Sequence, residues 1–233
     1  MDMTLTLSVV ELRRYLMQPG RRDELIDLFE HAFIEPQEQC GMTVVGHYRD
    51  LDDPRSFVWF RGFPAMQTRR AALEAFYLHS PAWLDNRDAA NATMIDSDNV
   101  LLLRPARPDS GFDLSGLRRD SDADSFVGAA IVMLAGAPDA AAIEAFERET
   151  LDALRADAQR VAYFVTEERP NDFPRLPVRE SEWAFVVTGV CETAAALERW
   201  TSRVREHLPA ELRGPAIGTE YLRLEPAGRS LYR

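Results

Sequence analysis

The feature that most constrains this 233-residue chain is a pair of segments that end alike. Residues 98–105, Asp-Asn-Val-Leu-Leu-Leu-Arg-Pro, close the first segment, and residues 219–226, Thr-Glu-Tyr-Leu-Arg-Leu-Glu-Pro, close the second. Each segment carries the same predicted series: strand, helix, two strands, helix and last strand. One face of such a unit's sheet packs on its own helices, and the other face needs a partner. Two copies in one chain can therefore cover each other and enclose a cavity.

The side-chain patterns locate the elements of the first copy. Alternation predicts strands at residues 7–16, 42–49, 56–63 and 99–104. Apolar spacing predicts helices at residues 21–38, from Pro64 onward and at residues 81–94. Helices and strands interleave without the repeated βαβ pattern of a doubly wound sheet. The fold class is therefore α+β, with antiparallel strands and helices on one face.

The second copy follows a polar segment. Strands are predicted at residues 126–134, 161–166, 183–190 and 218–224, and helices at residues 138–158 and 193–208. Residues 168–182 form a long loop with three prolines, of the kind that serves as a lid or an interface arm. We expect three parts: residues 1–106 as the first repeat, 107–124 as a linker and 125–233 as the second repeat.

The composition limits the classes of function. A formal net charge of −11 opposes nucleic-acid binding, because phosphates require clustered Lys and Arg. No apolar run approaches the roughly 20 residues that span a bilayer. The N-terminal residues lack the basic start and the apolar stretch of a signal peptide. Cys40 and Cys191 lie in different halves and form no CxxC pair, which favours a reducing cytoplasm.

Several runs in the first copy resemble the bacterial NIPSNAP family. They are Glu11-Leu12-Arg13 with Tyr15 before Pro19-Gly20, Trp59-Phe60-Arg61-Gly62-Phe63-Pro64, Ala75-Phe76-Tyr77, Ser80-Pro81-Ala82-Trp83, and residues 87–94 and 96–103. The resemblance covers residues 5–105. The second half is similar to the tandem copy of longer members, including residues 171–179.

The resemblance implies a ferredoxin-like dimeric α/β barrel, with two antiparallel sheets facing each other inside one chain. Members of that superfamily include cofactor-free monooxygenases, polyketide cyclases, lactone isomerases and some haem enzymes. The NIPSNAP family itself has no single activity, so the resemblance specifies the fold more closely than the function.

Polar side chains on two central strands are the first candidate site. Glu11, Arg13 and Tyr15 share one face of the first strand, and Trp59 and Arg61 share one face of the third. The opposite, apolar faces would cover the helices, so we expect the polar set to point into the barrel and bind an anionic or enolate-like ligand. The alternative is a Glu11–Arg ion pair that only holds the two sheets together.

The remaining candidates lie on the second strand and in a helix. His47 could act as a general base, although a lone strand histidine is more often hydrogen-bonded or at the surface. Asp88 and Asn91 could contact a ligand from a cavity lid. We favour helix and strand capping for these two and for Asp96 and Asp98.

Metal binding has little support, because the histidines show no HxxxH or HExxH spacing. No dedicated cofactor is expected, although His47 or His79 leaves haem open, since haem needs one axial ligand.

The resulting hypothesis is a cofactor-independent enzyme that acts on a small secondary or aromatic metabolite by cyclisation, isomerisation, dehydration or oxygenation. In this scheme Arg13 and Arg61 stabilise negative charge, Tyr15 or His47 transfers a proton, and Trp59 stacks on the substrate with Glu11 nearby. One alternative is a non-catalytic ligand-binding or protein-interaction module, and another is a haem-binding barrel. Open strand edges leave monomer and homodimer both possible.

Overall fold

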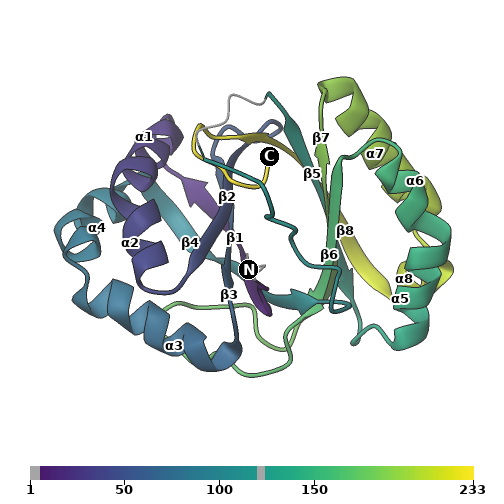
Figure 1. Ribbon diagram of the computed structural model, residues 1–233, viewed down its shortest axis with the longest axis horizontal. Helices are drawn as coiled ribbons and strands as arrows, with labels where there is room; N and C mark the ends of the chain where they lie inside the picture. The colour runs from purple at the N-terminus through teal and green to yellow at the C-terminus, as the bar shows by residue number, and fades with distance from the viewer. Residues whose placement is uncertain (1–5, 120–123) are drawn as a thin grey trace.

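Eight strands close into one barrel in the computed structural model, which describes residues 6–119 and 124–233 (Figure 1). The order around the barrel is β1-β3-β2-β8-β5-β7-β6-β4, and every neighbouring pair is antiparallel. The strands are β1 (Val9–Met17), β2 (Thr43–Asp50), β3 (Ser56–Phe63), β4 (Met94–Pro105), β5 (Phe126–Leu134), β6 (Arg160–Thr166), β7 (Trp183–Cys191) and β8 (Ala216–Pro226). The predicted α+β barrel made of two ferredoxin-like halves in one chain is confirmed.

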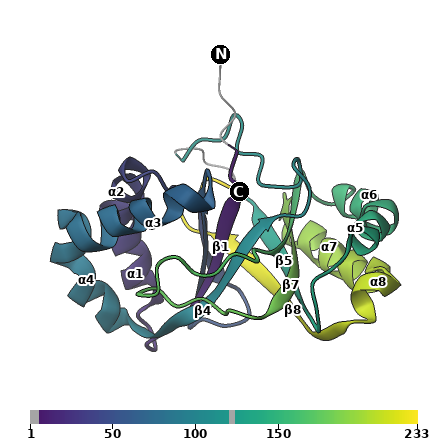
Figure 2. The same cartoon turned by 90° about the horizontal axis from the view of Figure 1, so that it is seen from below.

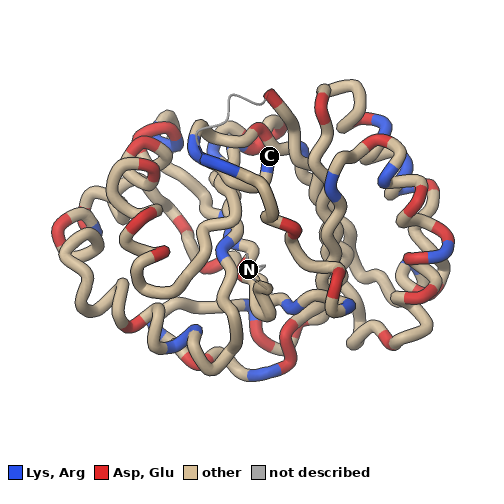
Figure 3. Tube along the Cα trace, viewed as in Figure 1, with Lys and Arg blue, Asp and Glu red and all other residues tan. Residues whose placement is uncertain are grey.

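Two helix layers flank the barrel (Figure 1). The first layer contains α1 (Arg22–Leu28), η1 (Phe29–Phe33), α2 (Ile34–Gln39), α3 (Met66–Glu74), η2 (Ala75–His79) and α4 (Pro81–Thr93). The second contains α5 (Ala140–Phe146), η3 (Glu147–Leu151), α6 (Asp152–Arg155), α7 (Ala194–His207) and α8 (Ala210–Arg213). Segments η1 and η3 are single π-helical turns within longer helices, and η2 is a π-helical turn at the end of the helix that α3 begins. Acidic and basic residues are interspersed along these outer helices (Figure 3).

The predicted strands at residues 56–63 and 126–134 match β3 and β5. The last strand of each copy is longer than predicted, because β4 begins at Met94 and β8 at Ala216. The first residues of both strands are mostly exposed, so they lack the apolar alternation that identifies a half-buried strand. The short helix α8 was not predicted. No helix of the described ranges combines the length and the apolar character needed to cross a bilayer.

Apolar side chains from both copies fill the barrel interior. Val10 and Phe60 of the first copy belong to one buried cluster with Val127, Ile131 and Phe164 of the second. An eight-stranded barrel is just wide enough for side chains to fill it. The barrel lumen is therefore a packed core.

The expectation that the polar set points into the barrel is wrong. Trp59 packs with the first helix layer, and the same face of β1 and β3 carries Glu11, Arg13, Tyr15 and Arg61. The prediction assumed that the apolar face of each strand covers the helices. In a closed barrel both faces are buried, so apolar character does not distinguish the lumen from the helix layer.

The segment between the copies closes one end of the barrel. Phe112 packs against the rings of Phe60, Phe164 and Tyr232, with ring centroids 4.7–5.3 Å apart. Tyr232, near the end of the chain, is buried there too. Residues 120–123 of the predicted linker, and residues 1–5 of the predicted first repeat, lie outside the described residues. The boundaries of the predicted domains stay a prediction.

Candidate functional site

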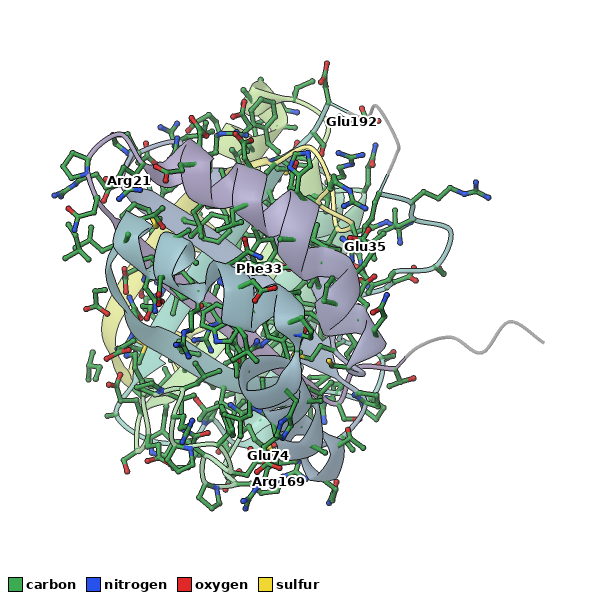
Figure 4. The ribbon with its side chains drawn as sticks, turned by 90° about the vertical axis from the view of Figure 1, so that its left-hand side faces the viewer. Arg21, Phe33, Glu35, Glu74, Arg169 and Glu192 are labelled. Atoms are coloured by element: carbon green, nitrogen blue, oxygen red, sulfur yellow. The ribbon has the colours of Figure 1, made fainter. Side chains whose placement is uncertain are left out.

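The first helix layer does not pack fully against the sheet. A cavity of about 270 Å³ lies between them, near the lower end of the size range of small-molecule sites. Aromatic side chains from the sheet and the helices line it: Phe29, Phe33, Trp59, Phe76, Tyr77 and Trp83. Figure 4 looks onto this layer, with Phe33 near its centre.

A single carboxylate beneath the cavity holds three guanidinium groups. Oε2 of Glu11 accepts hydrogen bonds from Arg13 Nη1 and Arg61 Nε, each at 2.8 Å. Oε1 of Glu11 accepts from Arg69 Nη2 at 2.7 Å and from Arg69 Nε at 2.9 Å. Burial alone would raise the pKa of the Glu11 carboxyl, but the three guanidinium charges hold it well below its usual range. Glu11 is therefore ionised, with its oxygens occupied.

The cluster carries more positive than negative charge. Arg69 Nη1 also pairs with Asp172 and donates to Asn171 Oδ1 at 3.1 Å. Three arginines thus face two carboxylates, those of Glu11 and Asp172. Buried charges are stable when they are balanced, so a ligand with negative charge would complement this cluster.

Two tyrosine hydroxyls extend the arginines into the cavity. Arg13 Nε donates to Tyr15 Oη at 2.8 Å, and Arg61 Nη1 donates to Tyr77 Oη at 3.0 Å. Burial raises the pKa of the Tyr15 phenol, and the charge of Arg13 only partly opposes this. Tyr15 therefore keeps its proton and can donate it in a hydrogen bond to a ligand oxygen.

Trp59 adds a hydrogen-bond donor whose acceptor is not among the described residues. It lines the cavity, is 2% exposed, and its indole N–H has no partner in the described part of the chain. Its ring meets Phe29 edge-on at 4.9 Å and Tyr15 at 6.0 Å. Leaving a buried donor unpaired costs about 1–3 kcal/mol, so an acceptor on a bound ligand would remove this cost.

The loop between β6 and β7 closes the mouth of the cavity. It leaves the second half of the barrel and runs under the sheet to the first helix layer (Figure 2). Phe173 is buried there and stacks on Tyr77, with ring centroids 6.3 Å apart. Arg175, Leu176 and Pro177 line the cavity. We call residues 168–182 the covering loop.

The comparisons with known proteins bear on both halves of the barrel. Residues 10–108 match the family model of NIPSNAP. These residues form a NIPSNAP domain. None of the curated proteins matches the chain significantly.

Solved structures similar to the whole chain show the same barrel. A monooxygenase-like protein from Fusobacterium nucleatum has a TM-score of 0.61 at 8% identity, over 95% of this chain and 93% of its own. Another from Lactobacillus acidophilus has a TM-score of 0.53 at 13% identity, over 94% of each chain. An anthrone oxidase-like protein has a TM-score of 0.56 at 11% identity, over 94% of this chain and 91% of its own. At these identities the likeness concerns the fold alone.

The cavity of the NIPSNAP domain brings together several of the predicted site residues. Arg13, Tyr15, Trp59 and Asn91 line it. Glu11 and Arg61 lie beneath it and hold Arg13 and Tyr77. The Glu11–Arg ion pair of the structural alternative is also observed. The same cluster packs between the sheet and the helices and forms the floor of the cavity.

Two predicted residues lie elsewhere in the NIPSNAP domain. His47 is buried, its Nε2–H donates to Glu30 Oε1 at 2.8 Å, and it does not line the cavity. Burial lowers the pKa of His47 in spite of this hydrogen bond. The side chain of Asp88 is 92% exposed beside Arg87. Neither residue lies where it could touch a ligand in the cavity.

The two histidines considered as haem ligands lie outside this cavity. The four histidines of the chain all lie within the described residues, and none of them lines it. His47 has its Nε2 bonded to Glu30, and His79 is exposed. No group of three or more His, Cys, Asp or Glu in the described ranges is arranged to hold a metal ion.

Sequence reasoning missed Arg69, Tyr77 and the inner residues of the covering loop. Arg69 did leave a signal, since it lies on the buried stripe of α3 with Met66 and Leu73. An arginine on such a stripe needs a buried anion. The sequence of the covering loop does not indicate which residues the loop contacts, because its contacts with the NIPSNAP domain join residues about one hundred positions apart.

Proposed function

We propose that the protein is a cofactor-independent enzyme that oxygenates a small aromatic ketone or phenol through an enolate held in the cavity of the NIPSNAP domain. The observation that carries this proposal is the unpartnered indole N–H of Trp59, beside Arg13 and Tyr15 in an aromatic cavity. Donors fixed before the reaction stabilise an oxygen that becomes negative, and they do so most strongly where water is excluded.

The residues would divide the work by their position. The aromatic wall would hold the planar substrate, and Trp59 and Tyr15 would donate to its oxygen. Arg13 would orient the Tyr15 hydroxyl and add positive charge, with Glu11 fixing the guanidinium. Arg61 would do the same for Tyr77. The names of the anthrone oxidase-like and monooxygenase-like proteins of the same fold support the choice of dioxygen as the second substrate.

Anthrone is a suitable probe because it is a planar aromatic ketone that enolises. One anthrone and one dioxygen give one anthraquinone and one water: the methylene carbon gains the quinone oxygen, and its two hydrogens leave in water. We expect the wild-type protein to form anthraquinone faster than the spontaneous reaction, as followed by absorbance and by oxygen uptake.

Trp59→Phe tests the proposal because it keeps an aromatic ring and removes the N–H. Loss of one such donor costs about 10²-fold in rate. Trp200→Phe is the matched control, since Trp200 in the second helix layer is also buried with an unpartnered N–H but does not line the cavity. We expect the control to keep the wild-type rate and both variants to keep their melting temperature within a few degrees.

The same measurements separate the alternatives. Binding of anthrone without turnover, seen as quenching of tryptophan fluorescence, would support a non-catalytic ligand-binding module. Equal rates for Trp59→Phe and wild type would contradict the proposed oxyanion site. A cytoplasmic location, and the choice between monomer and homodimer, stay predictions from the sequence.

A further inference from the structure

We propose that Asp98 is the catalytic base that removes the proton from the substrate, which rests on the proposed function. Formation of an enolate needs a group that accepts a proton from a carbon conjugated with the carbonyl. The side chains that the proposed function places on the substrate oxygen, Trp59 and Tyr15 with Arg13 behind it, donate hydrogen bonds and do not accept that proton.

Three carboxylates near the cavity are already occupied. Both oxygens of Glu11 accept from arginines, Glu30 accepts from His47, and Asp172 pairs with Arg69. Asp98 is the single carboxylate among the described residues that line the cavity. In the described part of the chain its side chain has neither a hydrogen bond nor an ion pair with another residue.

An irregularity in the sheet sets the position of Asp98. Along β1 and β4, Arg14 lies opposite Asn99, and Leu16 lies opposite Asp96. Tyr15 therefore faces two residues, Ser97 and Asp98, which is the pattern of a β-bulge. Bulges redirect side chains and occur frequently beside active sites.

The bulge brings both of its residues to the cavity. Ser97 and Asp98 line it together with Tyr15, although adjacent residues of a regular strand point to opposite faces. The backbone N–H of Asp98 donates to Asp96 Oδ1 at 2.7 Å, which fixes the turn of the chain at this point. The capping role expected of both aspartates thus falls to Asp96, and Asp98 is left free to act on a ligand.

The proton-transfer step balances without any further reactant. A C–H bond of the carbon conjugated with the carbonyl breaks, which in anthrone is the methylene carbon across the central ring, and its proton moves to the Asp98 carboxylate. The electron pair is delocalised through the ring, and the carbonyl oxygen becomes the negative oxygen of the enolate. That oxygen accepts from Trp59 and Tyr15, while Arg13 and Arg175 are the cationic side chains that line the same cavity.

Hydrogen exchange isolates this step from the reaction with oxygen. Anthrone is incubated with the protein in D₂O without oxygen, and mass spectrometry follows the uptake of deuterium at its methylene carbon. We expect wild type to exceed the spontaneous exchange rate and Asp98→Asn to lose about 10²-fold or more of the enzyme-dependent rate. The dissociation constant of anthrone should stay within about twofold, because the amide keeps the shape of the carboxylate.

Two further variants separate a base from a structural residue. Asp88→Asn is the matched control, since its side chain is 92% exposed and does not line the cavity, and it should exchange at close to the wild-type rate. Asp98→Ala should regain exchange when formate is added, because formate can take the place of the missing carboxylate.

The outcomes are distinct. Wild-type exchange in Asp98→Asn would overturn the role of Asp98 and leave the proposed function standing, and so would failure of formate to restore exchange in a folded Asp98→Ala. No acceleration by the wild-type protein would overturn both.

Discussion

The two helix layers of the barrel share a framework of aromatic contacts. In the first layer the ring of Phe29 lies 5.7 Å from Phe57 and 5.2 Å from His47. In the second, the ring of Phe146 lies 4.8 Å from Phe185 and 5.1 Å from Tyr163. The next residue of each helix is a glutamate that accepts a hydrogen bond from the strand, Glu30 from His47 and Glu147 from Tyr163.

The residues beside this aromatic framework differ between the two layers. Glu11 is opposite Arg61 in the first half, and the corresponding positions of the second half are Gly128 opposite Gly189. The indole of Trp200 occupies the space above both glycines. A Cβ at either glycine would lie 2.4 Å from the indole. One layer therefore has a charged cluster and a cavity, and the other has a tryptophan in a closed core.

The connections between the two middle strands also differ between the halves of the chain. The first half joins β2 to β3 through residues 51–55, whereas the second half joins β6 to β7 through residues 167–182. That longer connection includes the covering loop of the first layer. The second half has no counterpart of the charged cluster, and it provides the wall that completes the cavity of the first.

The largest expected effect comes from removing the centre of the charged cluster. Glu11→Gln removes the anion that three buried guanidinium groups share, although Arg69 keeps Asp172, and breaking a buried pair costs about 3–5 kcal/mol. We expect a loss near the upper end, about 5 kcal/mol, in the free energy of unfolding from urea titration. Glu24→Gln, which removes an exposed partner of Arg21, should leave stability nearly unchanged. Similar stability of wild type and Glu11→Gln would mean that the cluster is not needed for folding.

Trp200→Ala should make the second layer resemble the first. Truncating a fully buried tryptophan costs about 3–5 kcal/mol, and we expect about 4 kcal/mol here. Because an apolar cavity can bind a small aromatic molecule, added indole should raise the melting temperature of the variant by more than it raises that of wild type, since the first-layer cavity is common to both. Trp183→Ala, at a partly exposed position, should cost less and should respond to indole no more than wild type. An equal response by Trp200→Ala and Trp183→Ala would count against a specific cavity in the second layer.

Phe173→Ala tests the attachment of the covering loop. Loss of the buried ring on Tyr77 should favour the open loop by about tenfold, or ~1.4 kcal/mol. Trypsin cleavage after Arg175 should become faster by a similar factor under native conditions. Phe126→Ala removes a ring in the second layer and should leave this cleavage rate unchanged. An unchanged rate in Phe173→Ala would show that other contacts hold the loop.

The smallest expected effect is on the pH dependence of stability, through the contact between His47 and Glu30. Burial lowers the pKa of His47 below its ordinary value of about 6.5, so below that pH the unfolded chain binds a proton that the folded chain does not. The pKa of Glu30 is also lowered, since hydrogen bonds from His47 and from the Arg229 backbone outweigh the effect of burial. Both groups make the free energy of unfolding fall as pH falls.

His47→Tyr places a tyrosine where the second half has Tyr163, and it tests the direction of this pH dependence. Its melting temperature should fall less than that of wild type between pH 7.5 and pH 5.5, because the phenol does not titrate there. His31→Tyr, at an exposed position, should keep the wild-type dependence. Equal slopes for His47→Tyr and wild type would assign the loss of stability in acid to other groups.

Local sequence patterns were enough to predict the doubled βαββαβ unit, its antiparallel strands and the contrast between a polar first half and an apolar second half. Side-chain alternation also grouped Glu11, Arg13 and Tyr15 on one face. These properties depend on neighbours along one strand or helix, so local patterns carry them. The family resemblance of the first half follows from the same local runs.

Tertiary structure decided which side of the sheet that polar face meets. Alternation shows which residues share a face, but both faces of a closed barrel are buried, so it cannot tell the lumen from the helix layer. The contact of the covering loop with Arg69, the bulge at Asp98 and the position of Trp200 over two glycines also depend on packing between distant segments. The covering loop and the bulge complete the cavity of the first half. The position of Trp200 gives the second half a filled core.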